Sequence, residues 1–301
     1  MTIKQQILFC LLLAGCSAER DGAAFSGEGE APVSVTTSLD SDFLQSRADV
    51  SAGSIGVFLS SAGGYKPQYN VQYSYSGGWK ASAPVYVGAP NATLHAYYPY
   101  SASAFAANST TCTLTAQKYD AAKELYYASA SSSVVNSVSP TAAFAMARAY
   151  SRIKLSIQKQ GYGGNCNITN VNLKSGTGFY AGRTLNISNG TNGGSVTNGG
   201  WTYALNTGNM AENATNTAYD VLVPPQPVAS GLAITLTVDG VNRSITVPAT
   251  QFTSNSLAAG LQYTIGLKVT ASGLTIGTSV YEQAWNTTTT AGTVTDSSGI
   301  N

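Results

Sequence analysis

Apolar and polar residues alternate along short runs of the chain, and turn-forming clusters separate these runs. In the second half the apolar positions recur at every second residue, which is typical of strands that bury one face and expose the other. The clearest runs are 153–157, 219–223, 234–238, 241–247 and 263–269. Between two of them stands Asp239-Gly240, which predicts a two-residue hairpin turn because a type I′ turn needs positive φ at both central positions.

The first half predicts further strands at 33–37, 55–59, 71–75, 85–87, 93–98, 125–128 and 134–138. The segment Pro140–Tyr150 is rich in alanine, but Phe144 and Met146 alternate, so we expect a strand there as well. Regularly spaced short strands favour β-sandwiches. A chain of 301 residues suits two of them, and we place the boundary near Ser139-Pro140. The first domain would then span 32–139 and the second 140–301, with Asn186–Gly200 as a loop of the second.

The composition excludes several function classes. Charged residues make up 10% of the chain and hydrophobic residues 43%, which is common in secreted β proteins. The 15 basic residues are scattered, so no basic patch predicts a nucleic-acid partner. His95 is the single histidine, and the sequence assembles neither a catalytic triad nor a metal-ligand spacing around it. We therefore expect no cofactor, no metal and no enzymatic activity.

The amino-terminal segment has the features of an export leader. Lys4 precedes the apolar run Ile7–Leu13, which is too short to cross a bilayer as a helix. The run ends in Leu13-Ala14-Gly15-Cys16, which resembles the lipobox of bacterial lipoproteins. The resemblance implies that residues 1–16 form a lipoprotein signal peptide and that the thiol of Cys16 receives diacylglycerol and palmitate. The chain would then be held at the outer membrane by its acyl chains, with 17–31 as a flexible tether.

Removing the leader changes both the charge and the cysteine inventory. Without Lys4, 14 basic residues balance 14 acidic ones, so the mature chain is neutral. Cys10 leaves with the leader, and Cys112 and Cys166 remain for pairing in an oxidising compartment. The sequence leaves two alternatives open, a disulfide between these two cysteines or two free thiols, because it does not place their Cα atoms.

An aromatic cluster in the first half allows two interpretations. Its members are Tyr65, Tyr69, Tyr73, Tyr75 and Trp79. Exposed tyrosine and tryptophan side chains are typical of carbohydrate- or protein-binding faces. Interior aromatic side chains are equally typical of a β-sandwich core, and we favour the core because Tyr73 and Tyr75 share one face of a predicted strand.

Several segments, in their order and spacing, resemble the fimbrillins, the subunits of type V pili. The resemblance covers nearly all of the mature chain, although the histidine that the family has after Phe144 is absent. It includes the tryptophan that closes the fold in the family, which corresponds to Trp285. The other segments that carry it are His95–Tyr100, Glu124–Ala128, Phe144–Leu155, Ile168–Leu173, Tyr219–Gln226 and Gly260–Val269.

The resemblance implies a fold and an assembly mechanism. Fimbrillins have two tandem transthyretin-like β-sandwich domains, reach the surface as lipoproteins, are cut by an arginine-specific protease and polymerise by strand exchange. Carried over to this chain, Val33–Thr37 would be the strand that is removed, and the cut would fall between Arg47 and Ala48. The partners would be other fimbrial subunits in a head-to-tail polymer, together with a host or bacterial surface receptor.

The carboxyl-terminal region leaves the type of subunit open. Leu274–Trp285 is β-prone, whereas Asn286–Asn301 is polar, with Val294 and Ile300 as its apolar side chains. Such a tail would be a weak donor strand, a loop, or the mark of a tip subunit that accepts a strand and donates none. The sequence therefore predicts a subunit or tip adhesin of a type V fimbria. The alternative is a monomeric, lipid-anchored glycan-binding protein.

Overall fold

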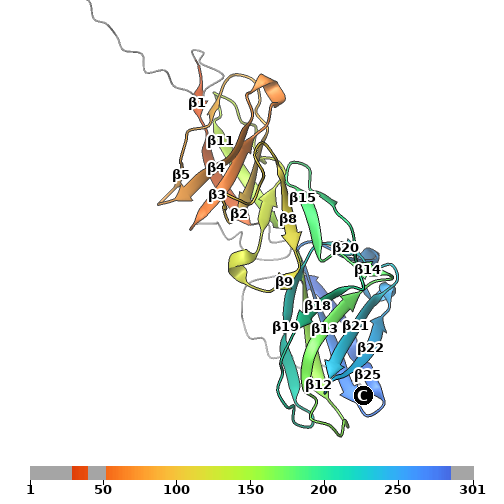
Figure 1. The fold of residues 1–301 in the computed structure, drawn as a ribbon. Helices are drawn as coiled ribbons and strands as arrows, with labels where there is room; N and C mark the ends of the chain where they lie inside the picture. The colour runs from red at the N-terminus through yellow and green to blue at the C-terminus, as the bar shows by residue number, and fades with distance from the viewer. Residues whose placement is uncertain (1–28, 40–51, 286–301) are drawn as a thin grey trace, which may run out of the picture.

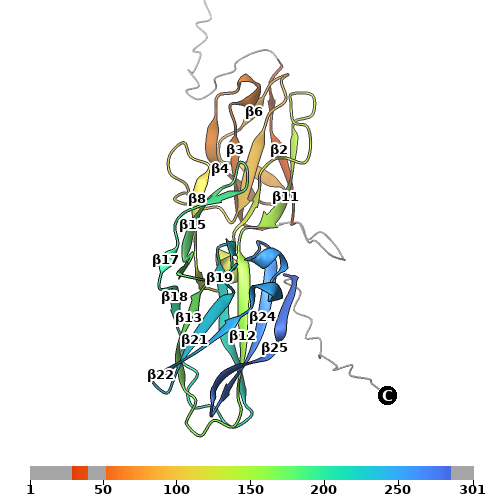
Figure 2. The same cartoon turned by 90° about the vertical axis from the view of Figure 1, so that its right-hand side faces the viewer.

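The computed structural model describes residues 29–39 and 52–285, and they form an all-β molecule. Two β-sandwiches lie end to end, the first built mainly from the amino-terminal half and the second from the carboxyl-terminal half (Figures 1 and 2). The all-β sandwich fold that the sequence predicts is therefore confirmed. The expected signal peptide, and the tether up to residue 28, lie outside the described residues.

The first sandwich is built on a seven-stranded sheet. Every neighbouring pair in it is antiparallel except β11 and β2, which are parallel. A short pair, β1 (Ala31–Pro32) with β6 (Tyr86–Val87), adds to this domain. In spatial order the seven strands are β2 (Ser34–Leu39), β11 (Thr141–Arg148), β10 (Tyr126–Ala128), β7 (Leu94–Tyr98), β3 (Ser54–Leu59), β4 (Gln68–Tyr75) and β5 (Trp79–Ala81).

The second sandwich packs a five-stranded sheet on a four-stranded one. Their facing side chains form one apolar core, because each strand turns alternate residues inward. The five-stranded sheet is β25 (Gly273–Ala284), β24 (Leu261–Thr270), β12 (Ser151–Lys159), β19 (Thr215–Val223) and β9 (Gln117–Lys118). The four-stranded sheet is β18 (Trp201–Ala204), β13 (Ile168–Lys174), β21 (Leu232–Val238) and β22 (Val241–Val247).

The remaining elements are short. Two more strand pairs lie in the second half, and a three-stranded sheet lies between the sandwiches. The pairs are β14 (Gly178–Phe179) with β17 (Thr197–Asn198), and β20 (Gln226–Pro227) with β23 (Ser256–Leu257). The three-stranded sheet is β16 (Thr191–Gly193), β15 (Gly182–Asn186) and β8 (Thr111–Thr115). Single 3-10 turns are η1 (Ala62–Gly64), η2 (Ala121–Lys123), η3 (Ala249–Gln251) and η4 (Thr253–Asn255).

The two sandwiches share a third apolar cluster at their junction. The segment between β7 and β10 leaves the first sandwich and contributes β8 to the three-stranded sheet and β9 to the edge of the five-stranded sheet. The junction cluster is made of Phe58, Tyr97, Phe105, Cys112, Leu114, Ala149, Tyr150, Leu185, Ile187, Leu222 and Trp285. Strand pairing and apolar packing therefore both cross between the domains.

Two arginines and a tryptophan close the junction. The guanidinium of Arg148 lies 4.8 Å from the ring centroid of Trp285, and that of Arg152 lies 5.1 Å from it. Arg148 also pairs with the buried carboxylate of Glu124, and Arg152 donates two hydrogen bonds to Asp220, of 2.7 and 2.5 Å. Cation–π contacts of desolvated guanidinium groups stabilise such packing, so the residue that follows β25 is held at the junction.

The hairpin expectation is confirmed, and two other expectations are corrected. Asp239 and Gly240 join β21 to β22 with φ values of 48° and 79°. The domain boundary expected near Ser139-Pro140 is wrong, because β11 pairs with β10 and β2 in the first sandwich. The second sandwich therefore begins with β12.

The strand expected over 134–138 is absent from the described secondary structure. Val135 forms a single bridge with Ala92. The side chain of Asn136 accepts hydrogen bonds from the backbone N–H groups of Val138 and Ser139, each of 3.0 Å. Such a local turn offers the backbone an alternative to a strand ladder, so the segment bends.

Candidate functional site

The strand β2 lies at an edge of the first sheet and pairs there with β11 alone. The pairing is parallel and runs over six register pairs, from Ser34 opposite Thr141 to Leu39 opposite Met146. The strand β5, at the opposite end of the sheet order, also lies close to β2. We call the space that β2 occupies between β11 and β5 the β2 groove.

Alternate residues of this segment point into the core of the first sandwich. Val33, Val35 and Thr37 are buried, and the two valines belong to the main apolar cluster of the domain. Ser34 and Thr36 are exposed. The prediction that 33–37 forms a strand that belongs to the first sandwich is therefore confirmed.

The polar groups around β2 are also satisfied by the first domain. The N–H of Val33 donates to the carbonyl of Val85 (2.8 Å), and the N–H of Ser34 donates to the carbonyl of Pro140 (2.9 Å). The hydroxyl of Tyr73 donates to the carbonyl of Val33 (3.4 Å). Burial raises the pKa of this phenol to about 12, because a phenolate in an apolar core loses its hydration.

Because β2 is an edge strand, its ladder contacts with the sheet are confined to β11. Its loss would leave the N–H and C=O groups along one side of β11 unpaired and would expose the apolar side chains beneath. Another strand with small apolar residues at alternate positions would fit the same β2 groove by β-augmentation. The geometry therefore supports a binding site for a peptide strand.

The predicted processing residues fall outside the described part of the chain. Cys16 lies in 1–28, and Arg47 and Ala48 lie between β2, which ends at Leu39, and the next described segment, which starts at residue 52. Lipidation at Cys16 and cleavage after Arg47 stay predictions.

The two remaining cysteines are free thiols. Cys112 is buried in the junction cluster and Cys166 in the core of the second sandwich. Burial raises the pKa of Cys112 to about 11 and also raises that of Cys166. Of the two alternatives that the sequence left open, the structure has the unpaired one.

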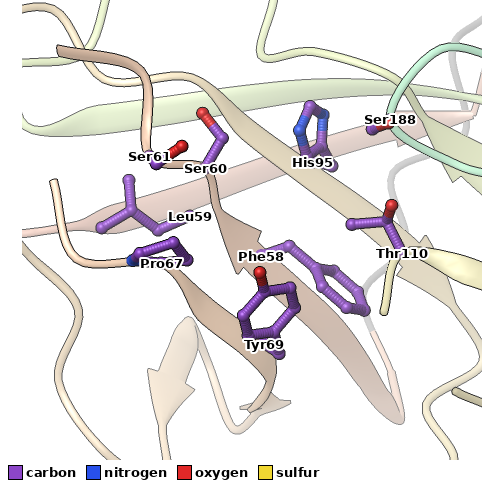
Figure 3. A pocket seen from close by; sticks show the side chains of 9 residues that line it. All are labelled: Phe58, Leu59, Ser60, Ser61, Pro67, Tyr69, His95, Thr110 and Ser188. Carbon is purple, nitrogen blue, oxygen red and sulfur yellow. The ribbon is translucent and has the colours of Figure 1, made fainter. Parts of the chain in front are cut away.

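A second feature is a pocket of about 340 Å³ beside β3 and β4 (Figure 3). It lies at the junction, since it takes residues from the first sheet and from the segments next to β8 and β15. Sequence patterns missed it because these segments are far apart along the chain. Its lining residues are Phe58, Leu59, Ser60, Ser61, Pro67, Tyr69, His95, Thr110 and Ser188.

The aromatic cluster of the sequence divides between core and surface. Tyr65 and Tyr73 are buried in the first core, as we favoured. Tyr75 and Trp79 are half-buried and pack edge to face at 5.3 Å. Tyr69 is 38% exposed and lines the pocket.

Neither metal ligation nor membrane crossing is evident in 29–39 and 52–285. Within these residues no group of three His, Cys, Asp or Glu side chains is close enough to hold a metal ion. The same part of the chain contains no helix with the length and apolarity needed to cross a bilayer.

Two β-sandwiches that lie end to end define the fold class of this chain. The chain belongs to the fimbrillin-like family, whose model matches residues 47–285. No curated protein matches the sequence.

Solved structures share this fold over most of the chain. A Bacteroides uniformis protein described as a cell adhesion protein is 17% identical, with a TM-score of 0.59 over 86% of this chain and 100% of its own. A similarly described protein from Bacteroides ovatus is 17% identical, with a TM-score of 0.58 over 85% of this chain and 98% of its own. A fimbrial protein from Bacteroides vulgatus is 11% identical, with a TM-score of 0.53 over 85% of this chain and 99% of its own.

Proposed function

We propose that this protein is a subunit of a surface fimbria and that it assembles when a strand of a neighbouring subunit takes the place of β2. The observation that carries the proposal is β2 itself, an edge strand that pairs with β11 alone and, with the residue before it, buries Val33 and Val35. The fimbrillin-like family and the adhesion and fimbrial structures of the same fold support it. The role is structural, and we assign no catalytic step to the chain.

The geometry of such a contact produces a filament. The β2 groove of one subunit receives a strand that belongs to a different part of the next subunit, so the two contact surfaces differ. Head-to-tail contacts of this type do not close on themselves unless the rotation between subunits returns to the start. Repetition of the contact would therefore extend the polymer one subunit at a time.

The free energy of the first domain is lower with a strand in the β2 groove than with the groove empty, so replacement of one strand by another is favoured over simple loss of β2. Burial of the two valine side chains, Val33 and Val35, contributes about 3–6 kcal/mol, and the ladder with β11 satisfies backbone groups that would otherwise be unpaired. Once the covalent link to the rest of the chain is cut, β2 holds its place by these contacts, by the adjoining β1–β6 pair and by the hydrogen bond from Val33 to Val85. A strand that fills the groove more completely can then displace it.

Export and processing complete the proposal. The lipobox would attach the precursor to the outer membrane through Cys16, and an arginine-specific protease would cut between Arg47 and Ala48. The family match begins at residue 47, so β2 lies outside the matched residues. The cut would separate β2 from β3, which is the next strand of the same sheet.

A reversible disulfide that locks β2 in place tests the mechanism. The side-chain oxygens of Ser34 and Thr141 are 2.8 Å apart on the exposed face of the β2–β11 pair, so S34C/T141C should form a cross-strand bond. We expect the soluble chain from residue 17 onward, after limited trypsin, to form SDS-resistant ladders. The oxidised lock should prevent them, and dithiothreitol should restore them.

Two controls make the result specific. The pair Thr235 and Ser244 has a similar oxygen separation, 2.7 Å, across the antiparallel strands β21 and β22 of the second sandwich, so T235C/S244C should not affect the ladders. Arg47→Ala should abolish them by removing the cut. Ladders that form equally with the S34C/T141C lock oxidised would refute strand replacement at β2. A chain that never forms ladders would favour the monomeric glycan-binding alternative.

A further inference from the structure

The pocket lies on the face of the first sheet opposite to the β2 groove. Phe58 of β3 and His95 of β7 are direct cross-strand partners and both line the pocket. Their neighbours Val57 and Ala96 point to the other face, into the core that β2 covers. Because side chains alternate across a sheet, replacement of β2 would leave Phe58 and His95 in place on the pocket side, although Leu59 belongs to both the lining and the core.

The lining offers hydroxyl groups and aromatic rings, and none of its side chains is permanently charged. Ser60, Ser61, Thr110, Ser188 and Tyr69 each contribute a hydroxyl group. Burial lowers the pKa of His95, so its imidazole is neutral at pH 7. A charged ligand would find no counter-ion among these residues, whereas a neutral ligand rich in hydroxyl groups would find matching partners.

Several of these groups are already oriented by the protein. Thr110 and Ser188 donate their hydroxyl hydrogens to the side-chain oxygen of Asn186, at 2.9 and 2.8 Å, which leaves their lone pairs as acceptors. The Nδ1 of His95 bonds to the carbonyl of Ser129. In the neutral ring this makes Nδ1 the donor and Nε2 the acceptor. The pocket therefore presents a set of fixed acceptors for ligand hydroxyl groups.

An aromatic face stands beside these acceptors (Figure 3). The ring of Tyr69 packs edge to face on Phe58, with ring centroids 6.5 Å apart and an interplanar angle of 84°. Phe58 is buried, while Tyr69 stays 38% exposed. The contact with Phe58 thus restricts the orientation of the Tyr69 ring. Tyrosine and tryptophan side chains combine an apolar ring with a polar tip, which suits ligand recognition at a solvent-exposed surface.

We propose that this pocket binds the terminal unit of a neutral saccharide, which stacks on Tyr69 and donates its hydroxyl groups to Thr110, Ser188 and His95. The volume of about 340 Å³ is at the lower end of the ~300–1,000 Å³ found for small-molecule sites, which suits a terminal unit and not a long chain. The proposal does not depend on polymerisation, because the site is complete in one folded subunit.

Binding to immobilised glycans tests the proposal. The chain from residue 17 onward, untreated with protease, is applied to an array of neutral, sialylated and sulfated oligosaccharides, and Kd values for the retained glycans are measured by titration. We expect binding to neutral glycans, about tenfold or more weaker for Tyr69→Ala. Ser61→Arg, which places a long side chain from an exposed position at the pocket, should also weaken it.

Matched measurements separate this proposal from fimbrial assembly. Tyr281→Ala removes a tyrosine that is 62% exposed on β25 in the second sandwich, and it should leave glycan binding unchanged. Tyr69→Ala should still form ladders after trypsin, so failure of one activity does not imply failure of the other. The proposal is overturned if no neutral glycan is retained, if only acidic glycans bind, or if Tyr69→Ala and Ser61→Arg both bind as the unmodified chain does.

Discussion

Buried tyrosines carry much of the packing in both sandwiches. Tyr73, Tyr97 and Tyr263 are each at most 1% exposed, and each uses its hydroxyl group for a hydrogen bond to the protein. This arrangement places a large apolar ring in the core without leaving its polar tip unsatisfied. The abundance of tyrosine in the sequence therefore reflects core packing more than exposed recognition surfaces.

These phenols predict a loss of stability in alkali. Burial raises the pKa of Tyr73, Tyr97 and Tyr263 to about 12, above the value of ~10 in an unfolded chain. Their contribution is fully present below pH 10 and is lost as the pH rises toward 12. Each should reduce the free energy of unfolding by about 1.4 kcal/mol per pH unit in that window, which urea unfolding between pH 8 and 12 would measure.

A phenylalanine variant isolates one of these contributions. Tyr73→Phe keeps the ring and removes the ionisable hydroxyl group, together with its hydrogen bond of 3.4 Å to the carbonyl of Val33. Because phenylalanine does not titrate, the stability of the variant should decline less steeply between pH 10 and 12. Tyr281→Phe alters an exposed ring and serves as the control. A free energy of unfolding that stays constant up to pH 12 would contradict the role assigned to these tyrosines.

The strand β2 is the element on which the proposed assembly depends. A synthetic peptide of Ala31–Leu39 should bind the trypsin-treated chain by exchanging with the cut segment. Val35→Asp in the peptide would place a carboxylate in the apolar core, and we expect binding to weaken by roughly 100-fold or more because an unpaired charge is costly to bury. Fluorescence anisotropy of a labelled peptide measures the exchange.

The neighbouring residue provides a matched control. Thr36 is exposed on β2, so a Thr36→Asp peptide, with the same charge, should bind about as well as the native peptide. Equal weakening by the two substitutions would show that charge alone, and not the inward position of Val35, governs binding. That outcome would argue against β2 as the occupant of a buried groove.

Elements with strict alternation were predictable from the sequence, and irregular ones were not. The inward set Ile153, Leu155 and Ile157 identified β12, and Asp239-Gly240 identified the β21–β22 hairpin. The prediction of a strand at 134–138 was wrong, because Val138 is 88% exposed and Asn136 closes a local turn. Three valines interrupted by Asn136 and Ser137 do not distinguish a strand from a bend.

The position of β11 and the pocket needed tertiary information. The alternation of Phe144 and Met146 predicted the β11 strand but not its partner, and its parallel pairing with β2 joins residues far apart in the chain. The pocket combines Tyr69 of β4 with Thr110 and Ser188, and neither of the latter belongs to an alternating run. The residue types at these positions do not predict a pocket unless the folded arrangement of the segments is known.

At the scale of the molecule, the junction makes the two sandwiches depend on each other. The segment that supplies β8 and β9 starts and ends in the first sandwich, yet it pairs with β15 and β19. Leu114 and Leu185 pack together with Trp285 in the shared cluster. We therefore expect the chain to unfold in a single calorimetric transition, although two domains of this size often unfold separately.

Variants in two apolar clusters test whether the two sandwiches unfold together or independently. Leu185→Ala removes a buried side chain from the junction and should both destabilise the protein, by about 2–5 kcal/mol, and split or broaden the transition. Ile234→Ala removes a similar volume from the core of the second sandwich. It should lower Tm without splitting or broadening the transition. Two separate transitions in the unmodified chain would contradict the coupling.

The parallel pairing of β2 with β11 has a mechanical consequence. The two strands run along the length of the first sandwich (Figure 2), and their six register pairs lie one after another along that direction. A pull along the molecular axis would load these backbone bonds together, in shear, whereas a sideways pull would peel them apart singly. A strand seated in the same place would share this geometry, so a filament of these subunits would resist tension far better than it resists stripping from the side.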